Sequence, residues 1–322
     1  KRLALPAGAR TGMSGIYRAL RRALRSRYAV QQPPEPAAHS TPPAAEPRIA
    51  IENLSFAYPD GATALHGVTL AVARGEFLAL VGPNGSGKTT LAKHLNGLLK
   101  PGGGRVRVDG RDTRQSRVAE LAHTVGYVFQ NPDHQIFAGT VEEEIAFGLR
   151  LRGLAPAGVA ERVDAAVAQF RLAEHRDLPP AVLGSGERRL VALAAVMATQ
   201  PQILILDEPT GGLDRRSRQE LMAAVNAYHR SGHTVILIAH DMRLVAEHAT
   251  RAAVLLEGRV LFDGPPAALF ARRDVLRQAR LAAPPVVRLA QRLEPAGLPR
   301  GIASVEQFVT AWSRLTAAEA GP

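Results

Sequence analysis

The chain has 322 residues, a formal net charge of +11 and a hydrophobic content of 46%, which is enough to bury a sizeable core. It contains no cysteine, so disulfides and thiolate metal sites are excluded. No apolar run reaches the roughly 18 residues that a membrane-spanning helix needs, and any membrane role is therefore expected to be peripheral.

The positive charge is concentrated at the two ends of the chain. Residues 1–47 contain eight basic and two acidic residues, and residues 271–322 contain eight basic and four acidic residues. The segment between them, 48–270, is nearly balanced, with 24 basic and 23 acidic residues. Basic tails suit an anionic surface, such as a membrane or a nucleic acid, or are simply solvated. The composition leaves these interpretations open.

The first 47 residues predict a basic helix followed by a linker. Residues 14–28 place apolar side chains on one helical face with Arg around the rest, as in a helix that lies on a membrane surface or docks on a partner. Residues 29–47 contain six Pro among many Ala, which is typical of a linker. The main folded domain is expected over residues 48–270.

From Arg48 onwards, short apolar runs alternate with helical patterns, which predicts an α/β fold with a mostly parallel sheet. Leucines at helical spacing predict a helix over Thr89–Leu99, and residues 140–200 contain no convincing strand, so a helical insertion is expected there. The expected strands are Phe77–Val81, Val125–Phe129, Ile203–Asp207, Thr234–Ala239 and Ala252–Leu256.

Residues 271–322 predict a small helical extension. Ser304 followed by Gln307 resembles a capping box at the start of a helix. An apolar stripe follows, which we assign to the core of this extension. Its members are Val305, Phe308, Val309, Trp312 and Leu315.

A phosphate-binding motif follows the first predicted strand. The segment GPNGSGKT matches G-x-x-x-x-G-K-[ST] in full and opens a helix, whose N-terminal N–H groups and dipole favour phosphate. Lys88 is expected to bind the β- and γ-phosphates of ATP, and the Thr89 hydroxyl to bind Mg²⁺. The predicted nucleotide-binding residues here are Gly82, Pro83, Asn84, Gly85, Ser86, Gly87, Lys88, Thr89 and Thr90.

Polar residues end three further strands. Asp207 and Glu208 follow the apolar run Ile203–Leu206, and Gln130 and His240 end the strands on either side of it in the sequence. Because the carboxyl ends of parallel strands meet at one edge of a sheet, these side chains are expected to face one nucleotide. We assign Glu208, as general base, with His240 and Gln130 to catalysis. The Mg²⁺ ligands are predicted to be Thr89, Gln130 and Asp207.

Read in order, these motifs resemble the nucleotide-binding subunit of ABC transporters over about residues 48–270. The resemblance implies an ABC-type P-loop ATPase fold with antiparallel β elements and an inserted helical subdomain, which hydrolyses ATP with Mg²⁺. Tyr58 resembles the aromatic residue that stacks on adenine. Gln130 resembles the Q-loop glutamine, and His240 resembles the switch histidine.

Two more family motifs lie further along the chain. The segment LGSGE, residues 183–187, stands where the family has its LSGGQ signature, so Ser185 and Gly186 are assigned to nucleotide binding by this resemblance. Asp214 in the sequence GGLD resembles the D-loop aspartate. The resemblance thus covers the whole of the predicted main domain.

Residues 129–137, FQNPDHQIF, and 140–148, TVEEEIAFG, are similar to the ATPases of energy-coupling factor (ECF) importers, of the cobalt-importer type. This resemblance implies an ATPase that energises uptake of a vitamin or a transition-metal cation, bound peripherally at the cytoplasmic face of the cell membrane. It implies three partners: a transmembrane coupling subunit, a second ATPase domain and, indirectly, a membrane-embedded substrate-binding subunit.

The signature departs from the family pattern. Gly184 stands in place of Ser, Ser185 in place of Gly, and Glu187 in place of Gln. In the family this loop grips the γ-phosphate bound to the other protomer. Loss of one hydrogen bond to that charge costs roughly 1.5–3 kcal/mol, or about 10- to 150-fold. We therefore favour a heterodimer over a homodimer; the alternative is that Ser185 substitutes adequately.

Other functions remain open at this point. A first residue Lys1 and a Pro-rich linker also suit the second half of a tandem fusion of two ATPase domains. An ABC exporter ATPase would carry the same motifs, and the basic tails suit a soluble ABC protein that acts on ribosomes or nucleic acid. Such soluble factors usually carry two ATPase domains, and the segment Asn131–Phe137 favours the importer. No nucleic-acid partner is therefore expected.

Overall fold

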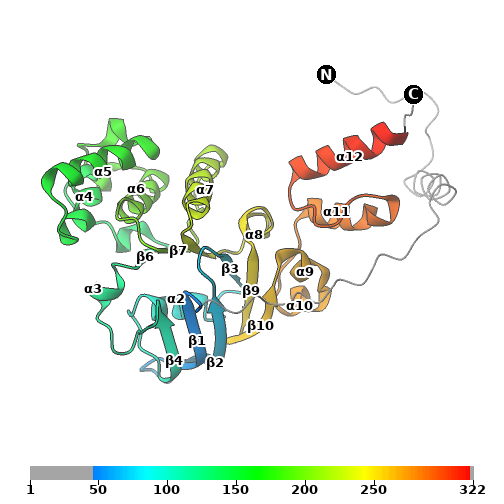
Figure 1. Cartoon of the computed structure of the whole chain (residues 1–322), viewed down its shortest axis with the longest axis horizontal. Coiled ribbons are helices and arrows are strands. Elements are labelled where there is room, and N and C mark those ends of the chain that lie inside the picture. The colour runs from blue at the N-terminus through cyan, green and yellow to red at the C-terminus, as the bar shows by residue number, and fades with distance from the viewer. Residues whose placement is uncertain (1–45, 320–322) are drawn as a thin grey trace. The chain divides into compact units, whose positions relative to one another are not determined.

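The structure is a computed structural model that describes residues 46–319 (Figure 1). The predicted basic helix at 14–28 and almost all of the Pro-rich linker lie outside the described residues. The described part divides into two compact units, one ending at Pro284 and one beginning at Pro285. The predicted boundary between the ATPase domain and the C-terminal extension, at residue 270, stays a prediction. Within 46–319, no helix combines the length and apolar character required to cross a membrane.

The first unit is built around a six-stranded sheet with the order β10-β9-β3-β8-β7-β6. Its neighbours run parallel, except that β10 pairs antiparallel with β9. The five predicted strands are confirmed, with ends that differ by at most one residue. The strands are β3 (Phe77–Val81), β6 (Val125–Val128), β7 (Ile203–Asp207), β8 (Thr234–Ile238), β9 (Arg251–Leu256) and β10 (Arg259–Gly264).

A second, antiparallel sheet has the order β2-β1-β4-β5. The sequence predicts antiparallel elements but not their positions. In β1, three register shifts against β2 and a left-handed backbone at Asn53 (φ 48) interrupt the simple apolar alternation that marks a strand. The strands are β1 (Ile49–Ala57), β2 (Thr63–Val72), β4 (Gly103–Val108) and β5 (Arg111–Asp112).

Both faces of the six-stranded sheet are buried, which explains why its strands are continuous apolar runs. Ile203 and Ile205 of β7 pack with the antiparallel sheet and with helix α2 (Lys88–Leu95), whereas Leu204 and Leu206 pack with the helices of the other face. α2 ends four residues before its predicted end. Asn96 and then Gly97, with φ 76, follow its last residue, and a left-handed glycine stops a helix.

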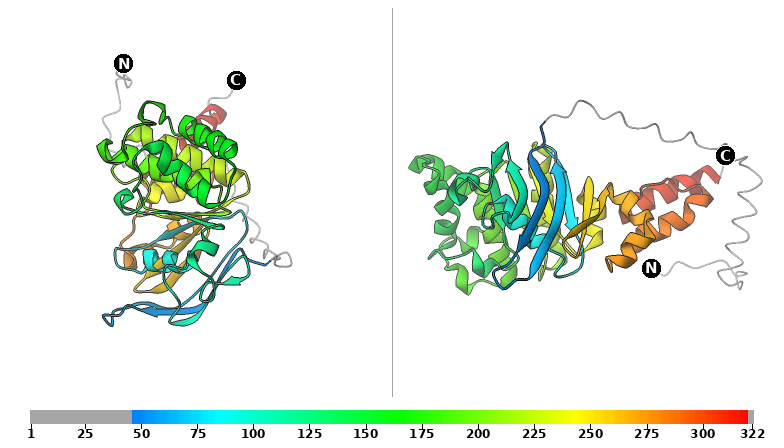
Figure 2. Two further views of the ribbon diagram at one scale, coloured as in Figure 1. Left: turned by 90° about the vertical axis from the view of Figure 1, so that its left-hand side faces the viewer. Right: turned by 90° about the horizontal axis from the view of Figure 1, so that it is seen from below.

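The predicted helical insertion between β6 and β7 is confirmed. Figure 2 shows its helices in green as a group on the opposite side of the unit from the antiparallel strands in blue. It contains α4 (Val141–Leu151), α5 (Pro156–Gln169), α6 (Ser185–Ala198) and two 3-10 turns, η2 (Ala173–His175) and η3 (Pro180–Val182).

The remaining helices of the first unit connect or flank the strands. α7 follows β7 and packs on the same face as the insertion, through residues such as Leu221 and Val225. These elements are α3 (Val118–Leu121), η1 (Pro132–His134), α7 (Arg215–Arg230), α8 (Met242–His248), α9 (Pro266–Ala271) and α10 (Arg273–Gln278).

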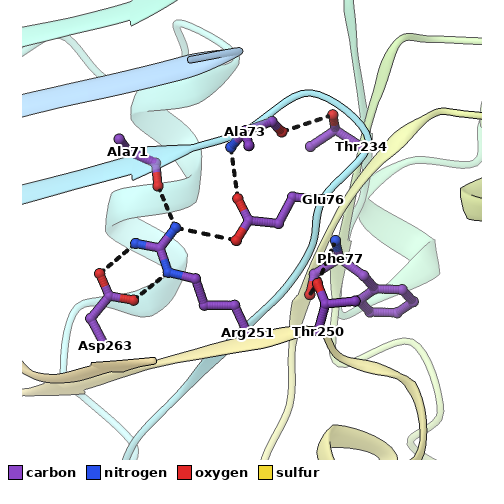
Figure 3. A network of polar contacts seen from close by, with 8 residues as sticks. All are labelled: Ala71, Ala73, Glu76, Phe77, Thr234, Thr250, Arg251 and Asp263. Atoms are coloured by element: carbon purple, nitrogen blue, oxygen red, sulfur yellow. Dashed lines mark hydrogen bonds and ion pairs between the residues drawn. The ribbon is translucent and has the colours of Figure 1, made fainter. Parts of the chain in front are cut away.

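A polar network ties the two sheets together at the ends of β3 and β8 that lie away from the P-loop (Figure 3). The Arg251 guanidinium makes two hydrogen bonds to Asp263 of β10 and donates to the Ala71 carbonyl of β2 (2.8 Å) and to Glu76 (3.2 Å). Glu76 in turn accepts from the Ala73 N–H (2.6 Å). One arginine of β9 therefore holds β2, β10 and the start of β3.

The second unit comprises α11 (Pro285–Leu293), η4 (Glu294–Ala296) and α12 (Val305–Glu319). Its small core contains Ala290, Leu298 and Ile302, with Phe308, Trp312 and Leu315 of the predicted stripe packed against them. The other two stripe residues, Val305 and Val309, are 63% and 55% exposed. Their assignment to the core was therefore wrong.

The predicted capping box at the start of α12 is present in modified form. The Ser304 hydroxyl accepts from the Gln307 N–H (3.2 Å), as expected. The Gln307 carboxamide accepts from Ala303 instead of from Ser304 (2.8 Å). The helix start is thus fixed by the residues that the sequence indicates.

Candidate active site

The P-loop connects β3 to α2 through backbone conformations that require glycine. Gly82 and Gly87 have φ of 145 and 99. A Cβ at Gly82 would overlap the Leu255 carbonyl oxygen, and a Cβ at Gly87 would lie 2.7 Å from the Ala64 carbonyl oxygen. The loop therefore lies directly against neighbouring backbone, and at these two positions only glycine fits.

Lys88 closes this loop from the inside. Its Nζ donates to the carbonyl oxygens of Gly82 (3.0 Å) and Pro83 (2.8 Å) and to the Ser86 hydroxyl (3.4 Å). Burial lowers the pKa of Lys88, while the negative charges of Glu208 and Asp207 oppose that shift. The ammonium group is thus held at the end of β3, beside two carboxylates.

Asp207, the last residue of β7, accepts two hydrogen bonds on one carboxylate oxygen. The donors are the Thr89 hydroxyl of α2 and the Tyr127 hydroxyl of β6, each at 2.9 Å. Burial raises the pKa of Asp207, against the effect of both hydrogen bonds. Tyr127 also has a raised pKa, through burial first and then through the Asp207 charge, so it remains a donor.

Glu208 lies next in the chain with its backbone in the left-handed region (φ 48). Its N–H donates to the Ile238 carbonyl of β8 (3.0 Å). Its carboxylate accepts from Gln130 Nε2 (2.8 Å), and His240 Nδ1 lies 3.5 Å from its other oxygen. The predicted residues from the ends of three strands therefore converge on one carboxylate.

Tyr58 and Thr90 lie on the other side of the P-loop helix. The Tyr58 hydroxyl is 3.0 Å from the Thr90 hydroxyl, and the Tyr58 ring packs edge-on against Phe56 (centroids 5.0 Å apart). Thr90 is buried and Tyr58 is half-buried. The structure thus joins these two predicted nucleotide-binding residues at the start of α2.

The signature residues are not bonded to the P-loop. Ser185 is exposed at the first turn of α6, and no hydrogen bond within residues 46–319 links it or Gly186 to the loop. Glu187 turns its carboxylate back onto its own helix: it accepts from the Gly184 N–H (2.8 Å), and its other oxygen lies 3.2 Å from His175 Nε2. Its charge is therefore partly compensated.

Asp214 begins α7. Its carboxylate accepts a hydrogen bond from the Ser217 N–H (2.7 Å), and this backbone hydrogen bond is the main cause that lowers the pKa of Asp214. It is exposed. Its observed contact is therefore with its own helix, separate from the Glu208 cluster.

Two residues that contact this site were not found from the sequence. Tyr127 is separated by 80 residues from the carboxylate to which it donates, and its position in an apolar strand reads as core. Arg189 donates to backbone carbonyls of three site segments, although it follows Arg188 in a run that reads as a solvated surface. Neither contact leaves a spacing signal in the sequence.

A family model and individual relatives of this chain point to the same protein family. The ABC transporter family model matches residues 65–211. The energy-coupling factor transporter ATP-binding protein EcfA1 of Symbiobacterium thermophilum is 46% identical over 281 residues, which cover 84% of this chain and 98% of the relative. The chain belongs to the ATP-binding proteins of ABC transporters, close to the ECF transporter ATPases. This family hydrolyses ATP to drive transport.

Two more relatives of this ATPase differ in length. The cobalt import ATP-binding protein CbiO of Rhodobacter capsulatus is 40% identical over 277 residues, 83% of this chain and 99% of the relative. A putative ABC transporter ATP-binding protein of Caldanaerobacter subterraneus is 44% identical over 266 residues, 83% of this chain. This chain spans only 46% of the length of that second relative.

Solved structures agree with the fold of the ATPase. The structure of cbiO1 from Clostridium perfringens, described as part of the ABC transporter complex cbiONQ, matches with a TM-score of 0.65 and 34% identity. It covers 78% of this chain and 100% of that one. A dimeric, post-hydrolysis structure of the ATP-binding cassette MJ0796, bound to ADP and phosphate, matches with a TM-score of 0.63 and 26% identity over 68% of this chain and 98% of that one.

Proposed function

We propose that this ATPase hydrolyses Mg-ATP with Glu208 as the general base. The observation that carries the proposal is the convergence of Gln130 (2.8 Å) and His240 (3.5 Å) on the Glu208 carboxylate. A base must lie within hydrogen-bond reach of the proton it takes, and these neighbours fix the direction of the carboxylate. Gln130 orients the attacking water beside it, and His240 contacts the γ-phosphate.

The metal site of this proposal uses oxygen ligands, which Mg²⁺ prefers. The Thr89 hydroxyl and the Asp207 carboxylate are already 2.9 Å apart, at the end of the P-loop. Bound Mg²⁺ would neutralise charge on the phosphates, with Gln130 as a further ligand.

The remaining assignments concern the nucleotide. The P-loop amides and Lys88 bind the phosphates, and Tyr58 stacks on the adenine, supported by Thr90 from the start of α2. Ser185, Gly186 and Asp214 contribute to an ATP held by a second ATPase domain. The exposure of Ser185 and Asp214 in the single chain supports this, because a surface that meets a partner is open without it; Gly186 is half-buried.

Replacing Glu208 by Gln tests the role of the base. The substitution keeps the size of the side chain and an acceptor for Gln130 but removes the proton acceptor. We expect turnover to fall by roughly 10²- to 10⁴-fold while ATP still binds. Glu161→Gln, an exposed glutamate on α5, is the matched control and should hydrolyse ATP normally. Near-normal turnover in Glu208→Gln would remove Glu208 from this role.

We further propose that the ATPase energises an ECF-type importer for a vitamin or a transition-metal cation. Support comes from the functions of its relatives, among them the cobalt import ATP-binding protein of Rhodobacter capsulatus. Its partners would be a transmembrane coupling subunit, a second ATPase domain and, indirectly, a substrate-binding membrane subunit. It would then lie peripherally at the cytoplasmic face of the cell membrane.

Affinity purification of the tagged chain from its native membranes in mild detergent tests the partners. Recovery of a transmembrane protein together with a second ATPase supports the importer, and a small membrane-embedded subunit names the substrate class. Recovery of ribosomal or nucleic-acid-binding proteins, without a membrane protein, would contradict the transport proposal and leave the ATPase chemistry in place.

The altered signature supports pairing with a different ATPase. Ser185 stands one position beyond the family's serine. The Glu187 carboxylate accepts a hydrogen bond from the Gly184 N–H and lies beside His175. The double substitution Gly184→Ser with Ser185→Gly should raise turnover of the chain on its own by roughly tenfold or more, if one hydrogen bond to phosphate is restored. Glu187→Gln alone is the control for the charge. A stable homodimer of the unmodified chain that hydrolyses ATP at family-typical rates would refute this.

A further inference from the structure

Arg189 joins separate parts of the active site from inside the protein. It lies in the second turn of α6 with 9% of its surface exposed. Its guanidinium donates to the carbonyl oxygens of Gln130 (2.9 Å), Glu208 (3.4 Å) and Gly211. These acceptors lie 59, 19 and 22 residues away in the sequence. One side chain therefore contacts the segments that carry Gln130, the base and Asp214, from the helix that carries the signature.

The bonding of Arg189 is unusual for a buried cation. Two other arginines of this unit have carboxylate partners: Arg188 pairs with Asp133 (2.9 Å), and Arg218 lies 3.9 Å from Asp241. Arg189 makes no ion pair within residues 46–319. The lack of a carboxylate partner distinguishes it from Arg188 and Arg218, because the buried Nε of all three has no hydrogen bond there. Burial lowers its pKa, and only the more distant Glu208 charge opposes that effect.

An apolar side chain would fill this space without the cost of burying a charge. What the guanidinium supplies is a rigid set of directed donors that holds three carbonyl groups at once. Two of these carbonyls belong to residues of the proposed reaction, Gln130 and Glu208. The contacts of Arg189 are therefore better suited to positioning these catalytic segments than to stabilising the fold.

Glu208 has a specific need for such support. Its backbone is in the left-handed region (φ 48), which is disfavoured for a residue with a side chain unless the surroundings hold it. Its N–H is held by the Ile238 carbonyl (3.0 Å) and its C=O by Arg189. Both backbone polar groups of Glu208 are thus held, which fixes the point from which its side chain leaves the backbone, while Gln130 and His240 contact the carboxylate itself.

We propose that Arg189 is a positioning residue for ATP hydrolysis, which ties the signature helix α6 to the backbone beside Gln130 and Glu208. The inference rests on the proposed function, since it requires Glu208 to be the base. A displacement of the first turns of α6 is passed through the guanidinium to the carbonyls that it holds. The reaction at Glu208 thereby depends on the position of this chain's own signature.

The test compares Arg189→Met and Arg189→Lys with Arg162→Met in the full chain, within the complex with which it purifies. Arg162 donates to the Ala198 carbonyl at the other end of α6 (3.2 Å) and is the matched control. For Arg189→Met we expect kcat to fall about tenfold or more, with KM for Mg-ATP changed less than about threefold, because the P-loop contacts are untouched. Arg162→Met should keep the kcat of the unmodified chain.

Arg189→Lys separates positioning from folding. Lysine keeps the charge but has one donor nitrogen and cannot reproduce the planar fork. We expect Arg189→Lys to have the thermal midpoint of the unmodified chain but only part of its kcat. Full recovery of both by lysine, or an unchanged kcat in Arg189→Met, would overturn the positioning role. Glu208→Gln is measured alongside. If Glu208→Gln is inactive, either of these two results refutes only the role of Arg189. If Glu208→Gln is active, the proposed base and the role of Arg189 are both refuted.

Discussion

His94 on the P-loop helix α2 is fully buried and bonded on one side of its ring only. Its Nδ1 lies 2.8 Å from the Thr90 carbonyl oxygen, which requires the hydrogen to be on Nδ1. Its Nε2 is buried without a partner, and the ring packs edge-on against Phe56 (centroids 4.8 Å apart). Burial lowers the pKa of His94 below the ordinary 6.5, despite the opposing bond to Thr90.

We expect the free energy of unfolding to fall as the pH drops below about 6.5, and to fall less in His94→Gln. Below that pH His94 is protonated in the unfolded chain but stays neutral in the folded chain. The contribution of His94 to the free energy of unfolding is therefore present above its ordinary pKa and is lost as the pH falls toward the lowered pKa of the folded state. Part of the decline remains, because burial also lowers the pKa of His248. Urea unfolding between pH 7 and 5 measures it.

Exposed His123→Gln is the matched control and should keep the pH dependence of the unmodified chain. If His94→Gln keeps the same slope as His123→Gln, burial of His94 does not contribute to the acid sensitivity.

Residues of the site differed in how far the sequence could predict them. Gln130, Asp207, Glu208 and His240 each end a strand, and their meeting follows from the parallel sheet, so their convergence was predictable. The orientation of Glu187 was not, because it depends on His175, twelve residues earlier and on another element. Contacts of this kind arise from packing between elements, which local patterns do not record.

At the scale of elements, Arg251 holds the junction of the two sheets. Its bonds reach β10 through Asp263, β2 through the Ala71 carbonyl, and the start of β3 through Glu76 (Figure 3). Its side chain is 28% exposed, so the pair with Asp263 is partly shielded from water. Hydrogen bonds that involve a charged group contribute about 1.5–3 kcal/mol.

Arg251→Met should therefore lower the free energy of unfolding by about 1–3 kcal/mol, measured by denaturant titration. ATP affinity should change little, because the network lies at the start of β3 and the P-loop follows its end. The control is Arg272→Met, which breaks an exposed pair with Asp274 and should lower the free energy of unfolding less than Arg251→Met does. Equal losses in the two variants would show that the network contributes no more than a surface pair.

The predicted and unpredicted elements differ in burial. β3, β7 and β8 are buried along their whole length and appear in the sequence as uninterrupted apolar runs. β1 and β2 alternate between buried and exposed positions, with irregular register between them. Their patterns therefore match neither a helix nor a regular strand, although the resemblance to ABC ATPases indicated that antiparallel strands exist.

At the scale of the whole molecule, the two units have separate cores, and a single tryptophan allows the unfolding of one of them to be followed. Trp312 is the single tryptophan of the sequence and packs in the small core of the second unit, with Ala290, Leu298 and Ile302 nearby. Tryptophan fluorescence therefore follows this unit, whereas far-UV circular dichroism follows the helices and strands of both.

We expect the fluorescence midpoint to come at lower denaturant than the circular dichroism midpoint, because a small core stabilises its unit less. Trp312→Phe should abolish the early fluorescence signal and leave the main circular dichroism transition in place. Coincident midpoints would contradict this and show that both units unfold as one.

The contacts of Lys88 within the P-loop determine which substitution is suitable as a catalytically inactive control variant. Lys88 donates hydrogen bonds to two loop carbonyls and one hydroxyl of the loop itself. Substituting it would remove the proposed phosphate contact and at the same time leave those buried acceptors without a donor. A defect in such a variant would mix a damaged loop with lost affinity. Glu208→Gln leaves the loop intact, so it is the cleaner standard against which every other variant of this chain should be compared.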